Sequence, residues 1–208
     1  MVLGNHGRGV QAALFTPFAR LLLSLRVSPN AVTIAGTVLT SGLALWLLPT
    51  GHLVLGALLL GFLALADSVD GVMARLTGRD GPYGAFLDST LDRVTDAAIF
   101  AGVLFWFVAH TDGAWQVAGM VSATACLALG SLVSYARAKA EALGVRASVG
   151  IAERADRIIV VLAAALLTGL GAPPAVLALA LALLAAASLV TVLQRMAAVS
   201  RQLRTIHG

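Results

Sequence analysis

The chain has 208 residues, of which 59% are hydrophobic and only 12% are charged. This composition excludes an ordinary soluble domain, and the length leaves no room for two domains, so we expect one membrane domain over residues 1–208. The net charge of +4 is assigned to contact with membrane lipid and not with nucleic acid. The single cysteine, Cys126, excludes an intrachain disulfide.

Residues 1–29 are predicted to form an arm on the membrane surface. They contain no apolar stretch followed by a small-residue cleavage site, so we expect no removable signal peptide. Apolar side chains recur at helical spacing between residues 10 and 26, which predicts an amphipathic interfacial helix that could also start at Thr16-Pro17. The alternative is a short membrane span broken by Pro17 and Arg20. The apolar face consists of Val10, Leu14, Phe18, Leu21, Leu22 and Leu25.

Six apolar segments follow, separated by turn sequences rich in Gly and Pro. Ser28-Pro29-Asn30 should cap the first of them. With their flanking residues, the segments approach the roughly 20 residues that cross a bilayer. We therefore predict an all-α integral membrane protein whose core, residues 30–200, has six transmembrane helices, followed by a tail with Arg201 and Arg204. The segments are residues 31–48, 53–66, 83–108, 115–135, 153–170 and 175–193.

The basic residues fall on one side of this topology. All fourteen Lys and Arg lie in the N-terminal arm, in the second-to-third and fourth-to-fifth connections with their flanking turns, or in the C-terminal tail, whereas the three opposite turns carry none. Because loops rich in Lys and Arg stay in the cytoplasm, both termini are expected there. We predict a multi-pass protein of the cell (plasma) membrane.

The segment between Asp67 and Asp92 carries four aspartates beside apolar runs, which is costly at membrane depth. On helices, Asp67 and Asp70 share a face at i, i+3, and Asp88 and Asp92 share a face at i, i+4. Two such faces opposed would form a cage of carboxylate oxygens. Like charges so close would need divalent cations, and oxygen ligands favour Mg²⁺, Mn²⁺ or Ca²⁺. The alternative is a polar helix end that faces water.

The spacing of eight residues in this segment is similar to the signature of the CDP-alcohol phosphotransferases. This resemblance implies an integral membrane enzyme that moves a phosphatidyl group from a CDP-linked lipid to an alcohol and releases CMP. The distribution of basic residues puts this segment, and with it the expected active site, at the cytoplasmic face. The resemblance alone implies a homodimer. The matching residues are Asp67, Asp70, Gly71, Ala74, Arg75, Gly84, Asp88 and Asp92.

The family resemblance also implies roles for particular residues. Asp67, Asp70, Asp88 and Asp92 would hold two Mg²⁺ ions, for which Mn²⁺ could substitute, and Asp92 would also act as general base on the acceptor hydroxyl. The missing side chain of Gly71 would let a nucleotide approach the backbone, and Arg75 would meet phosphate. The expected CDP-lipid-binding residues are Asn30, Ala31, Val32, Thr33, Gly71, Arg75 and Gly81.

A second set of polar residues could bind a phosphate on the acceptor, because arginine forks bind phosphate through two hydrogen bonds. The alternative is that each arginine anchors the protein at the cytoplasmic surface. Asp96 is expected to support the site, for example by pairing with Arg93. The expected acceptor residues are Ser134, Arg137, Arg154, Arg157 and Arg195.

Three short segments narrow the choice of acceptor substrate. Residues 134–141, Glu153-Arg154 with Arg157, and Gln194-Arg195 look like the actinobacterial members of the family that join CDP-diacylglycerol to inositol phosphate. That group is expected to have Lys and Arg where this chain has Arg137 and Lys139, an exchange that keeps the charge but changes the donor geometry. Glycerol phosphate is the main alternative acceptor, and a small cation-coupled transporter is the alternative outside enzymes.

Overall fold

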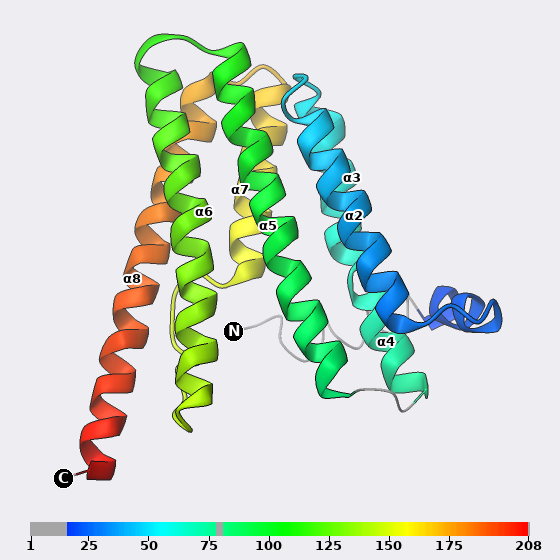
Figure 1. The fold of residues 1–208 in the computed structure, drawn as a ribbon. Helices are drawn as coiled ribbons and strands as arrows, with labels where there is room; N and C mark the ends of the chain where they lie inside the picture. The colour runs from blue at the N-terminus through cyan, green and yellow to red at the C-terminus, as the bar shows by residue number, and fades with distance from the viewer. Residues whose placement is uncertain (1–15, 78–80, 208) are drawn as a thin grey trace.

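A computed structural model of the chain describes residues 16–77 and 81–207, without the side chains of Ser68, Asp70 and residues 205–207. The first half of the predicted arm, with Val10 and Leu14, lies outside these residues. Every regular element in the described ranges is an α-helix, and the long helices run side by side as a bundle (Figure 1). The helices after the arm are α2 (Pro29–Leu47), α3 (Leu53–Ala66), α4 (Ser68–Thr77), α5 (Pro82–His110), α6 (Gly113–Ala142), α7 (Arg154–Gly169) and α8 (Pro174–His207).

The helices begin and end where local chemistry satisfies the free backbone groups. Ser28 caps α2, because its hydroxyl accepts a hydrogen bond from the Ala31 N–H at 3.2 Å, and Pro29 takes the first helical position. A reciprocal capping box of Glu153 and Asp156 starts α7. The predicted cap at Ser28-Pro29-Asn30 is confirmed.

The core forms where α5, α7 and α8 bury large apolar side chains, among them Phe100, Phe107, Val161 and Leu181. α6 packs along α8, α2 along α5, and α3 along α7. A side chain at Gly102 of α5 would collide with the backbone of α2, so the missing Cβ sets the closest approach of these two helices. The two halves of the bundle are thus joined through α5.

Four helical segments in the described part of the chain are long and apolar enough to cross a membrane: Pro29–Leu47, Leu53–Thr77, Gly113–Ala142 and Pro174–Arg204. The other two predicted spans are also helices, but α5 carries four charged residues in its first half and α7 has only 16 residues. Large apolar side chains point outward, with Val38 67% and Leu183 72% exposed, as suits contact with lipid tails. The chain is a membrane protein.

The tail predicted after the last span is helical, because α8 continues without a break to His207. Val199 and Leu203 pack against Val145 and Ala147 of the connection between α6 and α7. The Gln202 amide also accepts from the Arg146 N–H at 3.0 Å and donates to the Arg146 carbonyl at 2.6 Å. Tertiary contacts therefore keep the polar end of α8 helical.

A short helix, residues 16–24, precedes α2 and crosses the direction of the bundle (Figure 1). Its Ala19, Leu22 and Leu23 pack on α4, while Phe18 and Leu21 stay exposed. The predicted apolar face is therefore divided, since Leu22 turns to the protein whereas Phe18, Leu21 and Leu25 turn outward. This arrangement suits a helix lying at the membrane surface.

Candidate active site

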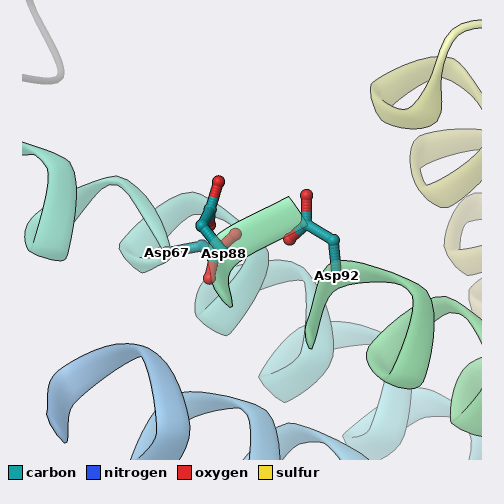
Figure 2. A group of neighbouring side chains, drawn as sticks. All are labelled: Asp67, Asp88 and Asp92. Carbon is teal, nitrogen blue, oxygen red and sulfur yellow. The ribbon is translucent and has the colours of Figure 1, made fainter. Parts of the chain in front are cut away.

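Three of the four predicted aspartates meet at one end of the bundle. Asp67, Asp88 and Asp92 each offer a carboxylate oxygen, and these atoms lie within 4.8 Å of one another. Figure 2 shows the three side chains converging from the α3–α4 junction and from α5. The side chain of Asp70, the fourth predicted ligand, lies outside the described residues. The oxygen donors fit a hard divalent cation, so the residues present suit the metal that the signature implies.

The backbone explains how these carboxylates come together. Asp67 stays in the right-handed helical conformation and its N–H donates to the Leu63 carbonyl at 2.9 Å, so α3 passes almost directly into α4. Asp88 and Asp92 follow one another by one turn of α5. The second apolar segment thus leads directly into the aspartate motif. We refer to Asp67, Asp88 and Asp92 as the carboxylate cage.

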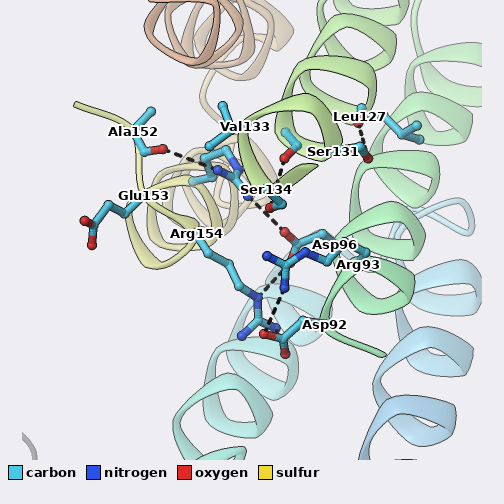
Figure 3. A network of polar contacts seen from close by, with 12 residues as sticks. Asp92, Arg93, Asp96, Leu127, Ser131, Val133, Ser134, Ala152, Glu153 and Arg154 are labelled. Carbon is cyan, nitrogen blue, oxygen red and sulfur yellow. Dashed lines mark hydrogen bonds and ion pairs between the residues drawn. The ribbon is translucent and has the colours of Figure 1, made fainter. Parts of the chain in front are cut away.

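Arg154, the first residue of α7, reaches into the carboxylate cage. Its guanidinium lies 3.0 Å from Asp92 and 3.4 Å from Asp67. Its Nε also donates to Asp96 at 3.1 Å (Figure 3). Arg154 therefore contacts the cage both at Asp67, from the α3–α4 junction, and at Asp92 of α5.

Asp96 connects Arg154 to a second, deeper arginine. One Asp96 oxygen accepts from Arg154, and the other accepts from Arg157 Nη2 at 3.2 Å. Arg157 is only 1% exposed and Asp96 only 9%. The predicted pairing of Asp96 with Arg93 is wrong, because Arg93 pairs with Asp92 at 3.5 Å and donates to the Ser89 carbonyl at 2.7 Å. Asp96 faces α7 and holds two arginines in place.

Replacing this buried charge should be costly. In Asp96→Asn, the shape is kept but Arg157 loses its carboxylate partner, so we expect a loss of about 3 kcal/mol in unfolding free energy. Glu141→Gln is the control, because it breaks the exposed Arg137–Glu141 pair and should cost no more than about 0.5 kcal/mol. Thermal unfolding in detergent measures both. Equal stability of the two variants would contradict the assigned role of Asp96.

A cavity of about 340 Å³ adjoins the carboxylate cage, since Asp88 is one of its lining residues. It gathers five of the seven residues predicted to bind the CDP-lipid: Asn30, Thr33, Gly71, Arg75 and Gly81. Ala31 and Val32 are not among the lining residues. Gly84 also faces the cavity, and a Cβ there would only touch Asn30 at 3.6 Å. The glycines thus enlarge the cavity without being required by the packing of the protein.

A larger and mainly apolar cavity of about 720 Å³ lies among α2, α3, α5 and α7. Gly61, Ile158 and Leu162 are among its lining residues, and Asp67 and Arg154 border it as well. The cage therefore meets two cavities, a smaller one that contains Asn30 and Arg75 and a larger one that is mainly apolar.

The remaining predicted acceptor residues lie beyond Arg154. Arg157 is packed over Gly130 of α6, and its Nε has no partner among the described residues. Arg195 of α8 is 4% exposed and donates to the carbonyls of Val133 and Val149. The Ser134 hydroxyl donates to the Gly130 carbonyl at 3.3 Å.

Arg137 differs from these buried groups, because it is exposed and pairs with Glu141 at 2.9 Å. The structure thus brings Arg157, Arg195 and Ser134 to the same stretch of α6. Arg137 lies at its outer edge.

Fold and site together define a membrane-embedded enzyme with a carboxylate cage. The family model described as CDP-alcohol phosphatidyltransferase matches residues 26–183, and the chain belongs to this family. The resemblance predicted from the aspartate signature is confirmed, and the chain is a phosphotransferase.

Two relatives of the chain carry the same name. The chain is 44% identical over 204 residues to phosphatidylinositol phosphate synthase of Cutibacterium acnes, covering 95% of this chain and 97% of the relative. It is 40% identical over 195 residues to the Corynebacterium glutamicum enzyme of the same name, covering 94% and 88%. These relatives are actinobacterial, as the three short segments indicated.

Solved structures of a phosphatidylinositol phosphate synthase have a similar fold. The crystal structure of Mycobacterium tuberculosis phosphatidylinositol phosphate synthase with CDP-DAG bound superposes with a TM-score of 0.85 at 38% identity, covering 90% of this chain and 94% of that one. The same enzyme in complex with manganese and citrate gives a TM-score of 0.84, with coverage of 89% and 88%.

Proposed function

We propose that this enzyme transfers the phosphatidyl group of CDP-diacylglycerol to inositol 1-phosphate and releases CMP. One observation carries the proposal: the carboxylate cage lies between a cavity of nucleotide size and two arginines of α7, the half-buried Arg154 and the buried Arg157. Asp88 lines the cavity, whereas Asp67 and Asp92 contact Arg154. A donor pyrophosphate and an acceptor phosphate would therefore reach the cage from different directions.

The cage and Asp70 would hold two Mg²⁺ ions, with Mn²⁺ as a substitute. Bound cations would supply charge neutralisation on the donor pyrophosphate. Asp92 would take the proton from the acceptor hydroxyl, and its contact with Arg154 would place it on the acceptor side of the cage. Manganese in a structure at 38% identity supports the metal assignment.

The two cavities would divide the donor lipid between them. Arg75 and Asn30 offer polar groups to the CDP moiety in the smaller cavity. The apolar cavity would take acyl chain, since it borders the cage at Asp67 and is lined mainly by aliphatic residues of α3 and α7.

Arg154, Arg157 and Arg195, with Ser134 and Arg137, would bind the acceptor phosphate. In Arg157→Gln or Arg195→Gln, loss of a charge-assisted hydrogen bond worth about 1.5–3 kcal/mol should raise the acceptor KM roughly ten- to hundredfold. The KM for CDP-diacylglycerol should barely change, because Arg75 and the metals hold that substrate. Steady-state kinetics with each substrate varied in turn measures the difference.

Arg201→Gln is the matched control. Arg201 is exposed and, among the described residues, donates only to the Ala197 carbonyl of its own helix at 3.3 Å, so both KM values should stay as in the wild type. An unchanged acceptor KM in both buried-arginine variants would refute their role in binding the acceptor phosphate.

The direct test of function is a product assay. Purified protein with labelled CDP-diacylglycerol should convert inositol phosphate in preference to glycerol phosphate, with one CMP released per lipid formed. A preference for glycerol phosphate would defeat the inositol assignment and leave the family assignment standing.

The proposal also includes the placement of the enzyme in the cell. Six spans with both termini in the cytoplasm of a plasma membrane would put the cage at the cytoplasmic face, where the basic connections lie. Two copies would form a homodimer, as the family resemblance implies.

A further inference from the structure

The connection between α6 and α7 leads directly into the two central arginines of the site. Its Ala152 is 2% exposed, and Arg154 and Arg157 follow within five residues. Whatever fixes this connection also fixes where both guanidinium groups lie. The contacts that hold it come mainly from α8.

Thr191 of α8 makes the central contact. Its Oγ1 accepts from the N–H groups of Ile151 and Ala152, both at 3.1 Å. The same hydroxyl donates to the Ala187 carbonyl at 2.9 Å. A hydroxyl has one proton and two lone pairs, so every hydrogen bond it can make is made. Thr191 is 0% exposed, and water cannot take over these bonds.

The methyl group of Thr191 fixes the same connection from another direction. Gly150 has a φ of +144°, and a Cβ added there would clash with Thr191 Cγ2. The connection therefore lies directly on the α8 side chain, and only glycine fits this contact without strain. Arg195, one turn further along α8, donates to the Val149 carbonyl at 2.9 Å.

The chain of contacts ends at the acceptor side of the site. The Ala152 carbonyl, next to the N–H that Thr191 binds, accepts from Arg157 Nη1 at 3.3 Å. The other end of that guanidinium reaches Asp96, which also holds Arg154. We propose that Thr191 is a positioning residue that aligns Arg154 and Arg157 for the acceptor phosphate. This inference rests on the proposed function for the identity of the acceptor.

The test compares Thr191→Val with Thr191→Ser. Valine keeps the shape and the methyl contact but leaves the buried Ala152 N–H and the part-buried Ile151 N–H without this acceptor, whereas serine keeps the hydroxyl. Because small misplacements of binding groups have large kinetic effects, Thr191→Val should raise the acceptor KM about tenfold while the KM for CDP-diacylglycerol stays within about twofold. Thr191→Ser should keep the acceptor KM of the wild type.

Thr168→Val is the matched control for buried threonines. Thr168 of α7 is 8% exposed, and its hydroxyl has no partner among the described residues. The same substitution there should leave both KM values unchanged. An effect of Thr191→Val no larger than that of Thr168→Val, or an equal defect in Thr191→Ser, would overturn the proposal.

A second measurement does not depend on turnover. Amide hydrogen exchange should show loss of protection at Ile151 and Ala152 in Thr191→Val and normal protection in Thr191→Ser. If Thr191→Val does not fold, Gly150→Ala should show the same pattern, and Gly150→Ala with Thr191→Ser should recover part of it because the clashing methyl is gone. Normal protection in both Thr191→Val and Gly150→Ala overturns the proposal.

The two hypotheses can fail separately. No conversion of inositol phosphate by the wild type would refute the proposed function, while the exchange experiment would still decide whether Thr191 holds the connection. Wild-type conversion with an unchanged acceptor KM in Thr191→Val would refute only the positioning role.

Discussion

Chelation of divalent cations is expected to reduce CMP release to background, and added Mg²⁺ or Mn²⁺ should restore it. Three carboxylates with oxygens within 4.8 Å of one another repel each other and bind a donor pyrophosphate poorly unless cations neutralise them. Labelled CMP release in excess EDTA, followed by a metal titration, measures the effect. Full turnover in excess chelator would sink the metal assignment.

The number of ions can be counted independently of activity. Binding of Mn²⁺ followed by electron paramagnetic resonance should saturate at two ions per chain in the presence of a CDP-lipid. Asp67→Asn should weaken this binding, because Asp67 contributes to the cage from the α3–α4 junction. Saturation at a single ion would replace the two-metal arrangement with a one-metal site.

Asp92→Asn should lower kcat by roughly 10² or more, the usual effect of losing a general base. Asparagine keeps an oxygen that can contact a metal but cannot accept the proton of the acceptor hydroxyl. Binding of CDP-diacylglycerol should survive this change better than it survives Asp67→Asn. Single-turnover kinetics and lipid binding measured on the same samples separate the two effects.

Asp112→Asn provides the control for a lost acidic charge. Asp112 is exposed, precedes α6 and makes no capping hydrogen bond with its side chain. Its replacement should leave kcat unchanged. Turnover of Asp92→Asn near the wild-type rate would place the base elsewhere.

Much of the fold follows from the sequence because apolar runs and turn residues act locally. The segment 53–66 is predicted with the bounds that α3 has, since Pro49 and Gly51 precede it and the aspartates follow it. The polar end of α8 is different, because residues 201–204 carry no apolar run. Its contacts with the distant Val145 and Arg146 hold it against the connection between α6 and α7.

In the candidate site too, local spacing predicts some features, whereas others depend on contacts between distant residues. Spacing along a helix predicts that Asp88 and Asp92 share a face, and the cavity contains Asn30 and Thr33 but not Ala31 or Val32 because residues three apart on a helix face the same way. The partner of Asp96 depends instead on how α5 meets α7, which local spacing does not specify. The same holds for the buried contacts of Arg195.

The length of α8 has a consequence for how the water-soluble substrate arrives. At 1.5 Å per residue, its 34 residues extend about 51 Å, whereas the hydrocarbon core of a bilayer is about 30 Å thick. If the helix starts at the far hydrocarbon boundary and runs along the bilayer normal, Arg195 stands about 32 Å along it, at the near boundary. The last turns of α8 then extend into water beside α6, which packs along α8. A phosphorylated polyol could reach Arg195 from the aqueous phase without entering the hydrocarbon, while the donor lipid never leaves it.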